Sequence, residues 1–228
     1  MAGEEEYGPG VEEQALRMAI GLPISAEALR RILDERLGFS GLGEAVELRL
    51  PGSLADAGAT AAPLRDAAVL IPIVKRPSGL NVILTRRPDH FKSHPGQVAF
   101  PGGRIDPEDK GPIEAALREA EEEIGLSPLL VDVRGVLAPL ATGTGFKIYP
   151  VIGLIDPSFE FNINVEEVAE AFEVPFEFLM DPKNHLEKTG EFRGQQRNYY
   201  EMPYGPHRIW GATAHMIVRL YRRLFGTA

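Results

Sequence analysis

The sequence predicts a layered α+β domain of the broad α/β class, preceded by an N-terminal helical extension. Short apolar runs with strand character come first, one long helix is inserted, further strands follow, and an amphipathic helix closes the chain. This order lacks the regular strand–helix–strand alternation of a parallel sheet, so a mixed layered arrangement is expected. We expect residues 1–64 to form an extension with one or two helices and a linker, and residues 65–228 to form the main domain.

The composition narrows the classes of function. The absence of cysteine excludes a disulfide framework, a cysteine-ligated metal and a thiol nucleophile. A net charge of −9, from 33 acidic and 24 basic residues, argues against a nucleic-acid partner. The first residues are acidic, unlike a secretory signal, and no apolar stretch approaches the ~18–20 residues that cross a bilayer. We therefore expect a cytoplasmic protein without a membrane partner.

The first elements follow from periodicity and turn residues. Residues 25–37 predict a helix, with Ser25 as its N-cap and apolar residues at helical spacing. Residues 51–64 are small and turn-rich, which is typical of a linker. Two apolar runs rich in β-branched residues, 67–74 and 80–86, predict a hairpin of buried strands.

The later elements surround a long loop. Residues 88–112 are dense in glycine and proline, and loops of this length inside a compact domain are usually functional. Pro112 suits the first turn of a helix that ends before Gly125. The remaining expected elements are strands near 130–138 and 147–155, helices over 166–173 and 175–180, a strand over 196–202 and a final helix over 210–225.

The helix after the loop carries the most informative charges. Glu119, Glu122 and Glu123 are spaced i, i+3 and i+4, so they share one helical face. Each like-charge pair costs about 0.2–0.5 kcal/mol, a cost that a divalent cation would remove. Oxygen ligands favour Mg²⁺ or Mn²⁺. The alternative is a solvated acidic surface without a metal. The preceding Gly102-Gly103 allows the backbone to approach a ligand closely, which favours the metal.

Two segments carry a family resemblance. Residues 118–126, REAEEEIGL, resemble the REUxEExGU core of the Nudix box, where U is a bulky apolar residue, and Gly103 occupies the place of its first glycine. Asp109 stands where the box has glutamate, and Arg118 follows one residue later than usual. Residues 84–103 resemble the upstream signature of coenzyme A diphosphatase-like Nudix hydrolases. The resemblance covers about residues 66–225 and implies an α/β/α sandwich with a mixed central sheet.

The resemblance assigns roles to the box. It implies that Glu119, Glu122 and Glu123, together with the carbonyl of Gly103, hold Mg²⁺ or Mn²⁺. Arg118 would pair with a box carboxylate and hold it in place. The general base varies within the family, and three residues are left open for that role: Glu119 within the box, and Glu166 and Glu167 from a later segment.

The loop over 86–98 is expected to clamp the substrate. Its expected substrate-binding residues are Arg86, Arg87, Lys92, His94, Gly96 and Gln97. The three cations would meet phosphates, although one of the two arginines could simply be solvated at the strand end. His94 could instead tie down the loop. Trp210 is expected in the core rather than as a stacking platform.

These residues together predict a reaction. The resemblance implies a divalent-cation-dependent hydrolase of a small nucleotide, coenzyme A or acyl-coenzyme A. Its products would be 4′-phosphopantetheine, or the acyl form, and adenosine 3′,5′-bisphosphate. One alternative is a Nudix hydrolase of ADP-ribose, NADH or another nucleoside diphosphate derivative. Another is a non-catalytic Nudix-fold nucleotide sensor, which the three intact glutamates argue against. A homodimer is possible by analogy with the family.

Overall fold

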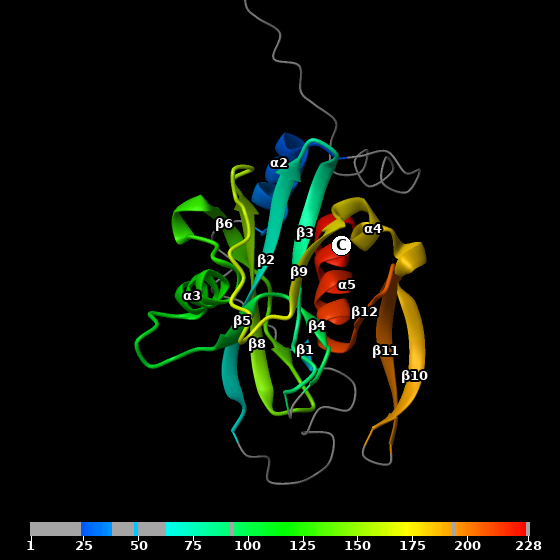
Figure 1. The fold of residues 1–228 in the computed structure, drawn as a ribbon. Helices are drawn as coiled ribbons and strands as arrows, with labels where there is room; N and C mark the ends of the chain where they lie inside the picture. Colours follow the sequence, from blue (N-terminus) through cyan, green and yellow to red (C-terminus); the bar gives the residue numbers. More distant parts are fainter. Residues whose placement is uncertain (1–23, 38–47, 50–62, 92–93, 193–194, 227–228) are drawn as a thin grey trace, which may run out of the picture.

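The computed structural model describes residues 24–37, 48–49, 63–91, 94–192 and 195–226 (Figure 1). The helices are α2 (Ala26–Leu37), α3 (Pro112–Ile124), α4 (Phe176–Met180) and α5 (Gly211–Phe225), with 3₁₀ turns η3 (Pro128–Leu130) and η4 (Pro182–Asn184). The strands are β1 (Leu48–Arg49), β2 (Arg65–Arg76), β3 (Gly79–Arg86), β4 (Val98–Ala99), β5 (Gly102–Arg104), β6 (Val131–Val136), β7 (Leu140–Ala141), β8 (Phe146–Ile155), β9 (Glu170–Pro175), β10 (Leu186–Phe192), β11 (Gln195–Tyr204) and β12 (His207–Trp210).

A mixed sheet forms the centre of the molecule. Its two middle strands, β2 and β8, pair in parallel from Arg65 opposite Phe146 to Val74 opposite Ile155. The predicted hairpin is confirmed, because β3 returns antiparallel to β2. Strands β9 and β4 pair antiparallel with β3 on its opposite sides, β4 only at Thr85 and Arg86, while β6 and β7 pair antiparallel with β8. The mixed central sheet expected from the sequence is therefore confirmed.

Helices cover both faces of this sheet. Residues of β2 alternate between the two faces: Leu70 and Val74 join the core beneath α3, whereas Ile71 and Ile73 join the core beneath α2 and α5. Figure 1 shows α3 on one side of the sheet, with α2 and α5 on the other. The α/β/α layering is thus built directly from the period of two in the central strands.

The helix of the N-terminal extension packs against the main domain. The hydroxyl Oγ of Ser25 accepts a hydrogen bond from the Ala28 N–H at 3.1 Å, which confirms the predicted N-cap. Its apolar face, with Leu29 and Leu33 fully buried, joins the same core cluster as α5. Residues 1–23 and most of the expected linker at 51–64 lie outside the described residues, so the division into two parts at residue 64 stays a prediction.

One predicted helix is wrong. Residues 166–173 were expected to be helical, but the chain makes a turn at 165–167 and then enters β9. This strand pairs antiparallel with β3, placing Val174 opposite Val82 and Phe172 opposite Leu84. The pairing satisfies the backbone groups along that side of β3 and buries Val174. Tertiary pairing therefore outweighs the local helix preference of a segment rich in glutamate and alanine.

A second, smaller sheet lies beside α5 (Figure 1). It contains β10, β11 and β12 in antiparallel order, of which only β11 was expected from the sequence. Buried Met202 and Ile209 join this sheet to the core beneath α5. Trp210 was expected in the core, yet it is 36% exposed at the end of β12, so that expectation is wrong.

Candidate functional site

Helix α3 presents the three glutamates as the sequence predicts. The helix starts at Pro112 and ends at Ile124, and Gly125 adopts a left-handed conformation with φ of 72°. The Gly125 N–H donates to the carbonyl of Glu121 at 2.9 Å, which closes the last turn. Ala115, Ala116 and Ala120 are fully buried, and their small side chains allow α3 to lie close to the sheet.

Strand β5 brings two glycines against this helix. It pairs with β2, placing Gly102 opposite Val69 and Gly103 opposite Ala68. A Cβ atom on Gly103 would collide with the carboxylate of Glu119, so the missing side chain gives that carboxylate its place. The carboxylate oxygen Oε2 of Glu123 accepts a hydrogen bond from the Gly102 N–H at 3.3 Å. The Gly-Gly pair and the glutamates thus form one structural unit.

Arg118 organises the carboxylates around it. Its guanidinium donates two hydrogen bonds of 3.1 Å to Asp109, whose side chain is only 4% exposed. Its Nη1 donates to Glu119 and to Glu122, each at 3.1 Å. These hydrogen bonds hold the pKa of Asp109 below, and that of Arg118 above, the usual value. The unusual spacing of Asp109 before Arg118 is therefore compatible with a bidentate ion pair.

Two glutamates are poor anions in this environment. Burial, followed by repulsion from Glu119, raises the pKa of Glu123 to about 8. Burial also raises the pKa of Glu119, although the neighbouring Arg118 opposes the shift. Glu167 adds negative charge near both carboxylates, while Arg87 favours the ionised form of Glu123. A positive charge arriving here would relieve the crowding of carboxylates.

A cavity of about 440 Å³ opens beside these groups, and we call it the glutamate pocket. It collects residues from the box, the upstream loop and the later segment; those predicted from the sequence are Arg87, His94, Gln97, Gly103, Glu123 and Glu167. Glu166 is exposed and does not line this pocket. Its volume lies within the ~300–1,000 Å³ of ordinary ligand sites.

Arg87 and His94 are held in unusual surroundings within this pocket. The Arg87 guanidinium lies 4.3 Å from the centre of the Phe91 ring, and its buried Nε finds no hydrogen-bond partner among the residues that the structure describes. The backbone N–H of Arg87 donates to the Gln97 carbonyl at 2.9 Å, which closes the loop. His94 has φ of 57°, rarely adopted by a residue other than glycine. The loop therefore holds Arg87 and His94 at the edge of the pocket on a constrained backbone.

The other loop residues expected to bind substrate lie elsewhere. Arg86 does not line the glutamate pocket; it donates to both carboxylate oxygens of Asp89 at 3.1 Å and lies 3.5 Å from Glu170. Gly96 borders a neighbouring cavity. Its φ is 64°, and a Cβ there would lie 2.8 Å from Asp89, so the position favours glycine. Lys92 lies outside the described residues.

Several pocket residues were missed by sequence reasoning. Arg104 follows the two glycines on β5, Phe146 begins β8, and Thr213 and Met216 come from α5. The hydroxyl of buried Thr213 donates to the Val98 carbonyl at 3.0 Å, which fixes α5 against the loop. Only Arg104 carried a usable signal, as a cation next to the expected glycines; the others arrive through tertiary packing.

The residues of α3 have the right chemistry for a divalent cation. Hard oxygen donors crowd one face, and Gly103 leaves space that a side chain would fill. Across the described ranges, no group of three His, Asp or Glu side chains is already arranged to coordinate a metal ion. Arg118 is instead the positive partner of Glu119 and Glu122. A cation would therefore fit by taking over carboxylates that Arg118 now holds.

Comparison with known proteins identifies the family. The model of the NUDIX domain matches residues 64–193, more than half of the chain. The chain belongs to the Nudix hydrolase family. An uncharacterized Nudix hydrolase NudL of Yersinia enterocolitica is 43% identical over 167 residues, which is 73% of this chain and 85% of the relative. Another, of Photorhabdus laumondii, is 43% identical over 160 residues, 70% of this chain and 85% of the relative.

A solved structure was also found, at a lower level of similarity. The Nudix hydrolase RenU of M. smegmatis is 28% identical, covers 54% of this chain and 77% of its own, and has a TM-score of 0.45. Membership of the Nudix family makes this protein a hydrolase of nucleoside diphosphate derivatives, a class of enzyme that generally uses divalent cations. Among the described residues, no helix is long and apolar enough to span a membrane.

Proposed function

We propose that this Nudix hydrolase cleaves the diphosphate of coenzyme A or acyl-coenzyme A, using Mg²⁺ or Mn²⁺. The observation that carries the proposal is the glutamate pocket, where His94, Gln97 and Arg87 of the upstream signature border the same cavity as Glu123. The products would be 4′-phosphopantetheine, or its acyl form, and adenosine 3′,5′-bisphosphate.

The glutamate pocket and the adjoining face of α3 support separate roles for their residues. Glu119, Glu122 and Glu123, with the carbonyl of Gly103, would hold the cation, which supplies charge neutralisation for the diphosphate oxygens. Arg87 and Arg104, which both line the glutamate pocket, would donate to those oxygens. Arg118 would act as a positioning residue, since its two hydrogen bonds to Asp109 would keep it in place when the cation takes over Glu119 and Glu122.

Glu167 is our choice for the general base. It borders the glutamate pocket, whereas Glu166 does not. The side-chain amide of Asn164 donates to Glu167 at 3.3 Å, and the Asn164 N–H donates to the Glu123 carbonyl at 3.0 Å. These bonds tie the turn carrying Glu167 to the end of α3. Glu167 is exposed enough to receive a proton from an attacking water.

The test compares coenzyme A and ADP-ribose as substrates, with Mg²⁺ or Mn²⁺ and with an EDTA control. We expect cation-dependent release of adenosine 3′,5′-bisphosphate from coenzyme A and much slower cleavage of ADP-ribose. Cleavage of ADP-ribose without cleavage of coenzyme A would overturn the proposed substrate but keep the family chemistry. Binding without cleavage of either substrate, in the presence of the cation, would favour a nucleotide sensor.

A further inference from the structure

A second cavity of about 410 Å³ adjoins the glutamate pocket, and we call it the second pocket. His94 and Gln97 border both cavities, so a ligand could extend from one to the other. The remaining wall that matters here comes from Arg86 on the loop side and from His207, Arg208 and Trp210 of β12. The second pocket therefore lies between the substrate loop and the small sheet, which the Nudix box does not include.

The wall of the second pocket differs in charge from that of its neighbour. Its described residues include two arginines and two histidines but no carboxylate, whereas Glu123 and Glu167 line the glutamate pocket. In a chain with a net charge of −9, a wall of this kind is unusual. Such a surface offers hydrogen-bond donors to an anionic group.

Arg208, one of the two arginines of this wall, is fixed from one side. The Nε of Arg208 donates to Glu201 at 2.6 Å, and its Nη2 donates to the Tyr199 hydroxyl at 3.0 Å. Its Nη1 makes no hydrogen bond to any part of the chain that the structure describes. The Arg208 side chain is 52% exposed, so that remaining edge is accessible to a ligand. Holding the guanidinium in advance reduces the entropy lost on binding.

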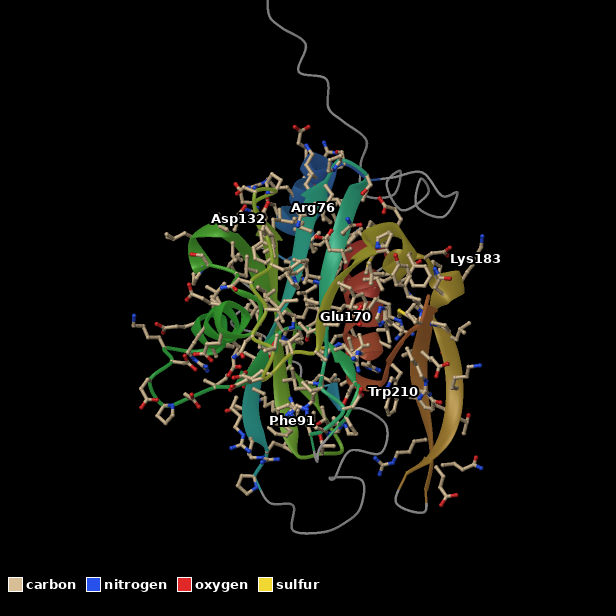
Figure 2. All side chains as sticks on the ribbon, in the orientation of Figure 1. Arg76, Phe91, Asp132, Glu170, Lys183 and Trp210 are labelled. Carbon is tan, nitrogen blue, oxygen red and sulfur yellow. The ribbon has the colours of Figure 1, made fainter. Side chains whose placement is uncertain are left out.

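An exposed aromatic ring stands beside this guanidinium. The Arg208 guanidinium carbon lies 4.8 Å from the centre of the Trp210 ring, and Tyr199 packs edge-on against that ring at 5.9 Å. Figure 2 shows Trp210 beside β11, close to the start of α5. A partly exposed tryptophan next to an arginine is a combination that binds a base by stacking and a neighbouring phosphate by hydrogen bonds.

We propose that the second pocket binds the 3′-phosphorylated nucleoside end of the substrate, with the purine against Trp210 and the 3′-phosphate at Arg208. The diphosphate then lies across His94 and Gln97 in the glutamate pocket. The identity of this nucleoside rests on the proposed function. Because the second pocket contains no carboxylate of the box, its ligand can be tested without turnover and without a cation.

The test uses the intrinsic fluorescence of Trp210, which is the sole tryptophan of the chain. The full-length protein is titrated in EDTA with adenosine 3′,5′-bisphosphate and, separately, with adenosine 5′-phosphate. We expect both nucleotides to quench the fluorescence, and the bisphosphate to bind about tenfold more tightly, as charge-assisted hydrogen bonds to a second phosphate allow.

Two variants of Arg208 locate the phosphate. Arg208→Gln should weaken binding of the bisphosphate about tenfold and leave the 5′-phosphate nearly unchanged, while Arg208→Lys should fall between. Lys183→Gln removes the same charge from exposed η4, which precedes β10 at the edge of the small sheet opposite β12 and lies away from Trp210 in Figure 2, and should change neither affinity. Melting curves verify that each variant is folded; if Arg208→Gln is not, Arg208→Lys alone decides.

Each outcome separates the two proposals. Binding of the bisphosphate seen by calorimetry without a change in fluorescence would overturn the second pocket as its site. If the Arg208 variants bind both nucleotides more weakly by the same factor, the 3′-phosphate does not bind at Arg208. Fluorescence changes as expected, in a protein that does not hydrolyse coenzyme A, would support this inference and refute the proposed function.

Discussion

The two adjoining pockets share His94 and Gln97 but differ in nearly everything else. The glutamate pocket is built on a regular helix and strand, and burial raises the pKa of Glu123 within it. The second pocket is built on a loop and a small sheet, and Arg208 within it is largely exposed. The difference teaches that crowded carboxylates suit a reaction that needs positive charge, whereas exposed donors suit recognition.

Removing one carboxylate from α3 should cause the largest loss of activity. If it did not, the glutamate pocket would not be the catalytic one of the two. Glu122→Gln and Glu123→Gln should each lower kcat by at least ~10²-fold, as losses of electrostatic stabilisation do. Glu121→Gln, on the exposed outer face of the same helix, is the matched control and should stay within twofold of the wild type, a ~0.4 kcal/mol difference. Near-normal turnover of Glu122→Gln or of Glu123→Gln would refute the assignment of that glutamate as a metal ligand.

Removing the proposed general base should cause the next largest loss of activity. Glu167→Gln should lower kcat/KM about 10²-fold, because general bases contribute about that much. Glu166→Gln, one residue away in the same exposed turn, should leave kcat/KM unchanged. Small and equal losses of kcat/KM in these two variants would indicate that Glu119 is the general base.

A smaller effect is expected where the backbone makes room for a carboxylate. Gly103→Ala would push the Glu119 carboxylate away, and we expect about a tenfold loss of activity, or ~1.4 kcal/mol in the barrier. Stability should change little, because the colliding group is the end of a flexible side chain. Gly102→Ala should reduce the melting temperature as well, since its Cβ would meet the backbone of Ala68 and its φ is 155°. Equal melting temperatures for the two variants would contradict this distinction.

The raised pKa of Glu123 should also affect the pH dependence of stability. The pKa of Glu123 is raised from 4.5 to about 8 in the folded protein. The folded state therefore binds this proton more tightly, and the associated stability is present at low pH and lost as the pH rises towards about 8. Without divalent cations, the wild type should lose more melting temperature between pH 5 and 9 than Glu123→Gln, a window set by that shift. Added Mg²⁺ should restore part of the loss in the wild type. Parallel profiles would show that Glu123 ionises normally.

The sequence predicted the glutamate pocket far better than the second one. Helix α3 was predictable because Pro112, Gly125 and the spacing of Glu119, Glu122 and Glu123 are local signals. The partner of Arg118 was not foreseen as Asp109, since a pair nine residues apart depends on how the loop folds back.

The errors have a common physical origin. The segment 166–173 became partly a strand because β3 offered backbone groups to pair with, which no local pattern reveals. Trp210 was expected in the core because tryptophan is usually buried, but β12 ends at the surface. The second pocket brings Arg86 and residues 94–98 together with residues 206–208 and Trp210, and a contact over that separation in sequence leaves no periodic signal.

The most direct test of the division between the two pockets compares coenzyme A with dephospho-coenzyme A, which lacks only the 3′-phosphate. The account predicts that the wild type has a higher kcat/KM for coenzyme A, and that Arg208→Gln loses this preference about tenfold through KM, with kcat unchanged. Glu122→Gln should lower kcat for both substrates alike and keep the preference. The same ratio of kcat/KM values in wild type and Arg208→Gln would contradict the account.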